Sequence, residues 1–221
     1  MKIQMLTAVL GLSVLSSHAN VLITEYVEGG SNNKAIEISN LGTADVDLAA
    51  GGYKIDLYAN GKTETTNGIL LQGLLIPGSS IVVYNAGATD AFKLDAPQGI
   101  SDASVTYFNG DDAIALVRNG VIVDVIGEDG PDIGYGWDVA GVSQATQDRT
   151  LIRKCSVNEG NSDWSLSAGS NAQNSEWLVR NINDWADLGQ HNDSCQGTYL
   201  YGCMDSNASN YYPSADGEDG S

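Results

Sequence analysis

Few residues in this sequence could carry out chemistry. A hydrolase needs a general base or a metal-activated water, which histidine, cysteine or clustered carboxylates usually supply. The 221 residues include only 2 histidines and 3 cysteines, and His18 falls in a segment that we expect to be removed. His191 and Cys195 are spaced so that both could bind one metal ion, but two ligands do not complete a site. We favour a capping or hydrogen-bonding role for His191 at the end of the domain.

The most conspicuous pair of carboxylates is formed by Asp111 and Asp112, which follow Asn109-Gly110. Adjacent residues on a strand point to opposite faces, so the two cannot act on one substrate unless a turn bends them together. We therefore expect them to form a turn and to begin a strand. The sequence has no Gly-x-Ser-x-Gly motif, no phosphate-binding loop before a helix and no His-Glu-x-x-His motif. This indicates that the chain is not an enzyme.

Three of the four tryptophans, Trp164, Trp177 and Trp185, lie in the final third of the sequence. They could line a sugar-binding face, but packing in the core is the stronger interpretation. The formal net charge is −18. Such a surface repels phosphate backbones, so we expect no direct binding of nucleic acid. This acidity fits solubility in salty surroundings better than it fits the binding of divalent cations.

The first nineteen residues have the layout of a secretory signal peptide. Met1-Lys2 supplies a positive charge, Met5–Leu15 is a short apolar run, and Ser17-His18-Ala19 offers small residues at a cleavage site. The run is too short for a membrane span of ~20 residues, and a buried N-terminal helix is the weaker alternative. We expect a secreted, extracellular product that begins near Asn20 and has no membrane span.

Short apolar runs separated by turn residues fill the rest of the sequence. Val21–Glu28 and Ala35–Asn40 are rich in β-formers, and apolar and polar residues alternate in Tyr53–Ala59. Asn60-Gly61 then suits the positive φ angles of a type I′ turn. Further strands are expected at Leu74–Ile76, Ser80–Asn85, Thr150–Lys154 and Glu176–Val179.

The strongest local signal is a pair of apolar runs, Ala113–Arg118 and Val121–Gly127, joined by Asn119-Gly120. This arrangement predicts a hairpin, and the near-continuous Val and Ile content indicates that both faces are largely buried. After the signal peptide, no segment has sustained 3.6-residue apolar periodicity. Many short strands at this spacing predict an all-β sandwich of two sheets.

Several segments resemble, in the expected order, those of the lamin tail domain family, in the form found at the N-terminus of secreted bacterial nucleases. The resemblance rests on Ile23–Gly29, Ser31–Ile38, Val46–Leu48, Tyr107–Leu116, Val123–Gly127, Thr150–Lys154, Glu176-Trp177 and Leu188–His191. It implies an immunoglobulin-like β-sandwich over residues 20–193. It also implies a non-catalytic module, with any nuclease activity in a downstream domain absent from this chain.

Residues 194–221 contain few aliphatic side chains and cannot build a core, so we expect a short irregular tail. Gly202–Ser221 is similar to an acidic repeat of secreted marine-bacterial proteins that closes with a cysteine directly after Asp-Gly-Ser. Because the sequence ends at Ser221, this resemblance implies a fragment.

All three cysteines lie in the part that we expect to be exported, where thiols oxidise. Together with the resemblance to lamin tail domains, this implies a disulfide between Cys155 and Cys195 that links the last strands to the end of the domain. Cys203 would then pair with a cysteine beyond Ser221. A Cys195–Cys203 bond with a free Cys155 stays open, as does an intermolecular bond, because spacing does not define connectivity.

A weak calcium-loop pattern lies in the tail, where Asp205, Asn207, Ser209 and Asp216 stand at positions 1, 3, 5 and 12. Asn210 occupies the position of the required glycine, and Asp216 replaces the bidentate glutamate. A turn beside a disulfide explains the same residues. We therefore predict no cofactor, with calcium at Asp205, Asn207 and Asp216 as a speculative site.

The leading hypothesis is a non-catalytic extracellular module that targets a secreted bacterial nuclease to a surface, a matrix or a protein ligand. The alternative is a calcium-dependent adhesion or carbohydrate-binding protein, which the acidity and the late tryptophans favour. A chain that is itself an enzyme is the weakest hypothesis, because bases and metal ligands are scarce.

Overall fold

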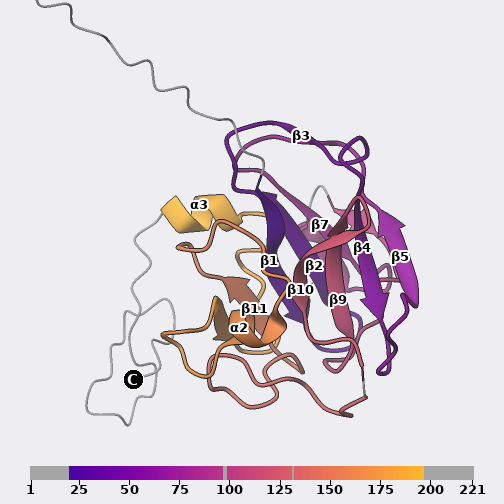
Figure 1. Ribbon diagram of the computed structural model, residues 1–221, viewed down its shortest axis with the longest axis vertical. Helices are drawn as coiled ribbons and strands as arrows, with labels where there is room; N and C mark the ends of the chain where they lie inside the picture. Colours follow the sequence, from indigo (N-terminus) through magenta and orange to yellow (C-terminus); the bar gives the residue numbers. More distant parts are fainter. Residues whose placement is uncertain (1–19, 97–98, 131, 197–221) are drawn as a thin grey trace, which may run out of the picture.

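The computed structural model describes residues 20–96, 99–130 and 132–196 (Figure 1). The predicted signal peptide, Cys203 and the speculative calcium site at Asp205, Asn207 and Asp216 lie outside these residues. The described part contains strands β1 (Val21–Glu28), β2 (Lys34–Asn40), β3 (Val46–Asp47), β4 (Tyr53–Tyr58), β5 (Asn67–Leu70), β6 (Leu74–Leu75), β7 (Ser80–Tyr84), β8 (Ile100–Ser101), β9 (Ala113–Arg118), β10 (Val121–Ile126), β11 (Thr150–Arg153) and β12 (Trp177–Arg180), with helices α1 (Asp90–Leu94), α2 (Trp164–Ala168) and α3 (His191–Gln196).

Two sheets make up the body of the fold. The larger sheet has the order β12-β11-β1-β2-β7-β8, and the smaller has the order β10-β9-β4-β5. Neighbouring strands are antiparallel except for β7 and β8. β3 and β6 form a separate short pair, which lies at the top of the view in Figure 1. The predicted all-β, immunoglobulin-like class is therefore confirmed.

The main core lies between the two sheets. β4 shows how the sequence builds it, because Tyr53, Ile55 and Leu57 alternate along the strand and all three are buried in the core. Ile36 of the larger sheet and Leu116 of the smaller belong to the same cluster. The alternation thus turns the apolar side chains of both sheets toward a shared interior.

A second, smaller cluster covers the outer face of the larger sheet. β1 is buried along its whole length, and its pairing with β2 shifts register between Ile23 and Glu25. Val27 then packs in a cluster with Phe92 of α1 and Leu188 of the C-terminal segment. Both faces of this central strand are therefore covered.

Both Asn-Gly dipeptides for which the sequence predicts a hairpin turn have the predicted positive φ angles, but only one of them forms a two-residue hairpin turn. Asn119 and Gly120 both have positive φ and join β9 directly to β10, which confirms the hairpin. Asn60 and Gly61 also have positive φ, but the connection is longer than a two-residue turn because β5 begins only at Asn67.

The prediction that both faces of the hairpin are buried is correct for β9 and wrong for β10. Val121 is 64% exposed. β10 is an edge strand of its sheet, so fewer neighbours cover its side chains.

The C-terminal helix α3 is joined to the end of β11 by a disulfide between Cys155 and Cys195, with a Cα–Cα distance of 5.3 Å. α3 crosses the domain boundary that we expected at residue 193. The helices have five or six residues, too few to produce a periodic sequence pattern. Among the residues that the structure describes, no helix has the length and apolar character needed to span a membrane.

Candidate binding site

Asp111 and Asp112 lie in a bend that leads into β9. Asp112 accepts the backbone N–H of Asn60 through Oδ1 at 2.7 Å and that of Asn109 through Oδ2 at 3.1 Å. With its side-chain nitrogen turned toward the carboxylates, Asn109 donates to Asp111 Oδ1 at 2.6 Å and to Asp112 Oδ2 at 2.8 Å. The bend therefore brings the two carboxyl groups to one amide, and Asp112 has the turn-forming role that the sequence predicts.

The pKa values of both carboxyl groups are raised. Burial is the main cause for each. The charge of Asp112 raises the pKa of Asp111 further, and the backbone N–H groups that Asp112 accepts lower its own. Because both oxygens of Asp112 already accept hydrogen bonds, this group is poorly placed to take a proton from a substrate.

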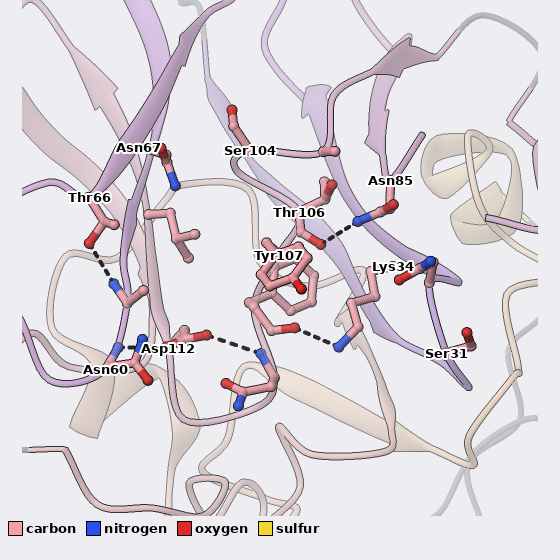
Figure 2. A pocket seen from close by; sticks show the side chains of 16 residues that line it. Ser31, Lys34, Asn60, Thr66, Asn67, Asn85, Ser104, Thr106, Tyr107 and Asp112 are labelled. Carbon is pink, nitrogen blue, oxygen red and sulfur yellow. Dashed lines mark hydrogen bonds between the residues drawn. The ribbon is translucent and has the colours of Figure 1, made fainter. Parts of the chain in front are cut away.

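A pocket of about 690 Å³ opens beside this bend (Figure 2). We call it the end pocket, because its walls come from the ends of β2 and β7 in the larger sheet and of β4 and β5 in the smaller. The loop before β9 completes the walls. The pocket is lined by Ser31, Asn32, Lys34, Leu57, Ala59, Asn60, Thr66, Asn67, Asn85, Ala103, Ser104, Thr106, Tyr107, Phe108, Asn109 and Asp112.

The positively charged side chain in the wall of the end pocket, Lys34, is bound by other groups of the protein. Lys34 Nζ lies 2.7 Å from Glu28 Oε1 and donates to the backbone oxygen of Phe108 at 2.5 Å. The same nitrogen lies 5.6 Å from the centroid of the Phe108 ring. Both charged side chains that line the end pocket, Lys34 and Asp112, therefore have partners within the protein.

Several neutral groups of the end pocket are free. Within the described part of the chain, the side chains of Ser31, Asn32, Asn60 and Asn67 make no hydrogen bond to protein groups. Tyr107 is 75% exposed, and in the view of Figure 2 it lies between Asn67 and Lys34. Amides and hydroxyls both donate and accept hydrogen bonds, so these side chains can bind a polar, uncharged ligand.

His191 and Cys195 do not form a pair of metal ligands. His191 is buried at the start of α3, with Nε2 3.5 Å from the sulfur of Cys195. That sulfur is bonded to Cys155 and so is not a thiolate ligand. Burial, followed by the charge of Arg153, lowers the pKa of His191 to about 4. In the described residues, no three His, Cys, Asp or Glu side chains are grouped to hold a metal ion.

Two of the three late tryptophans are buried, and Trp185 is partly buried. Trp164 and Trp177 are buried in the main core, as the stronger interpretation of the sequence predicted. Trp185 stacks edge-on against Phe92 at 4.9 Å and donates to Asp95 Oδ2 at 3.0 Å. They do not form a shared exposed face.

Sequence reasoning missed a buried charged network that joins the two sheets. Arg153 of β11 is fully buried, and its Nη2 lies 2.5 Å from Asp124 Oδ2 of β10. Its Nη1 lies 2.6 Å from Glu176 Oε2, and its Nε donates to the backbone oxygen of Ile23 at 3.0 Å. The guanidinium carbon lies 3.8 Å from the Trp177 ring centroid. The sequence offered one sign of this network, because Arg153 ends the otherwise largely apolar strand β11.

Comparison with known families gives a match over the first part of the chain. The family model described as Lamin Tail Domain matches residues 15–130, which is more than half of the 221 residues. The matched range includes every residue that lines the end pocket. No curated protein matches the chain.

Proposed function

The chain belongs to the lamin tail domain family, and we propose that it is the interaction module of a secreted bacterial nuclease. The domain type is non-catalytic and immunoglobulin-like. The proposed role is to position the nuclease at an extracellular surface or matrix.

The end pocket is the observation that carries this proposal. Its charged side chains, Lys34 and Asp112, are engaged by protein groups, while its free side chains are neutral hydrogen-bonding groups. A catalytic base needs an oxygen or nitrogen free to take a proton. The pocket suits recognition of a ligand better than its chemical conversion.

Two further arguments support the extracellular setting. The N-terminal residues have the layout of a signal peptide, and Cys155 and Cys195 form a disulfide, a bond typical of oxidising compartments. The link to a nuclease rests on the order of the segments from Ile23–Gly29 to Leu188–His191.

The first experiment is to read the gene beyond the codon for Ser221. A continuation into a nuclease domain is expected, and a stop codon at that point would contradict the nuclease link. In parallel, the purified chain is tested for sedimentation with washed extracellular matrix and for cleavage of DNA. We expect co-sedimentation without cleavage. Binding that appears only with calcium would favour the alternative, a calcium-dependent adhesion protein.

A further inference from the structure

We propose that the end pocket binds a neutral oligosaccharide. This inference rests on the proposed function, because it names the ligand class of the same pocket. Its volume of about 690 Å³ falls in the range of small-molecule sites, roughly 300–1,000 Å³. It can therefore hold a short chain of sugar rings.

The hydrogen-bonding groups favour hydroxyls. Asn32 and Asn60 come from two separate loops, and Asn67 stands at the start of β5, so three amides reach the pocket from different directions. Each amide offers both donors and an acceptor, which matches a hydroxyl group that also does both. The apolar side chains of the wall, which are Leu57, Ala59, Ala103, Tyr107 and Phe108, are outnumbered by the polar ones. This composition favours a ligand rich in hydroxyls over an apolar peptide.

The charges disfavour an anionic ligand. Lys34 is paired with Glu28, so it does not offer a free cation to a carboxylate, sulfate or phosphate. The formal net charge of −18 repels polyanions at long range. Acidic polysaccharides are therefore disfavoured relative to neutral ones.

Tyr107 supplies an aromatic surface. At 75% exposed, it is among the more exposed large side chains of the described residues. Tyrosine presents an apolar ring and a polar tip. The apolar C–H face of a sugar ring can pack on the ring while its hydroxyls reach the surrounding amides.

The test is isothermal titration calorimetry of the full chain with a panel of neutral trisaccharides: maltotriose, cellotriose, laminaritriose, xylotriose and chitotriose. Heparin and a neutral tripeptide are the comparison ligands. At least one trisaccharide is expected to bind, and Asn67→Ala and Tyr107→Ala are each expected to weaken that binding about tenfold, the effect of losing one good contact. Tyr135→Ala and Asn158→Ala, exposed positions outside the pocket, are the matched controls and should leave it unchanged.

Binding to none of the trisaccharides, binding that both pocket variants leave intact, or a preference for heparin or the tripeptide would each overturn the inference. The proposed function fails separately. If the chain still sediments with extracellular matrix but no trisaccharide binds, only the ligand class is wrong. If the chain sediments with no matrix, the interaction role itself is refuted.

Discussion

Replacing Glu25 with glutamine should make the protein more stable near neutral pH. Glu25 lies on β1 and is 1% exposed, and its Oε1 has no hydrogen-bond partner among the described residues. The residue opposite it on β2 is Glu37, also buried. Burial raises the pKa of Glu25 well above its ordinary value, and the charges of Glu37, Asp187 and Asp184 raise it further, against a smaller lowering by Arg180.

The size of the effect follows from proton linkage. Because burial raises the pKa of Glu25 above its ordinary value of 4.5, the unfolded chain loses the Glu25 proton at a lower pH than the folded chain does. The free energy of unfolding therefore falls as pH rises, by up to ~1.4 kcal/mol per pH unit for one proton. Glu25→Gln keeps the shape of the side chain and removes this loss, so its advantage should grow by up to ~2.7 kcal/mol between pH 5 and pH 7.

The assay is urea unfolding of both proteins at pH 5, 6 and 7, with Glu64→Gln as the control because Glu64 is exposed. Asp124, whose pKa is also raised, is present in both proteins, so its contribution cancels in the difference. A stability gap that stays constant from pH 5 to pH 7 would refute the claim that folded Glu25 holds a proton.

Three further changes test the rest of the fold. Arg153→Met leaves Asp124 buried without its cation and should lower the free energy of unfolding in urea by about 3–5 kcal/mol. A decrease below ~1 kcal/mol would show that the ion-pair network does not stabilise the fold. Reducing the Cys155–Cys195 bond, which spans a sequence separation of 40, should destabilise the chain by up to about 4 kcal/mol, and equal melting curves with and without reductant would contradict this. The pKa of His191 is about 4 in the folded protein, so between pH 6.5 and 4 the unfolded chain takes up a proton that the folded one does not. The free energy of unfolding should therefore fall by up to about 3 kcal/mol as pH falls, and this fall should be absent in His191→Gln. If the stability of the variant depends on pH below 6.5 in the same way as that of the unchanged protein, the low pKa of His191 is refuted.

The strands could be predicted because local patterns specify them. Val21–Glu28 is the full extent of β1, and the Asn-Gly turn places β9 and β10 within one residue of their predicted ends. β5 was missed because Asn67–Leu70 has neither alternation nor β-branched runs. Its position depends on pairing with β4, which is a tertiary contact.

The end pocket could not be predicted from local patterns. Its walls come from residues between Ser31 and Asp112 that meet only when the two sheets pack. Asp112 was identified as a turn residue, and its contact with Asn60 depends on a separate loop. The same holds for Arg153 and Asp124, whose ion pair joins strands of different sheets. Charge partners of this kind leave no spacing signal in a single sequence.

The central place of β1 has a consequence for how the chain folds. β1 pairs with β2 directly after it and with β11 on its other side, and Arg153 reaches back 130 residues to Ile23. Contacts between segments so far apart in the sequence make folding slow, because the entropy of closing a long loop is lost before the pairing of β1 with β11 forms. Until β11 arrives, one edge of β1 has unpaired backbone groups that can join another copy of the chain. A chain that ends before Thr150 should therefore aggregate rather than fold.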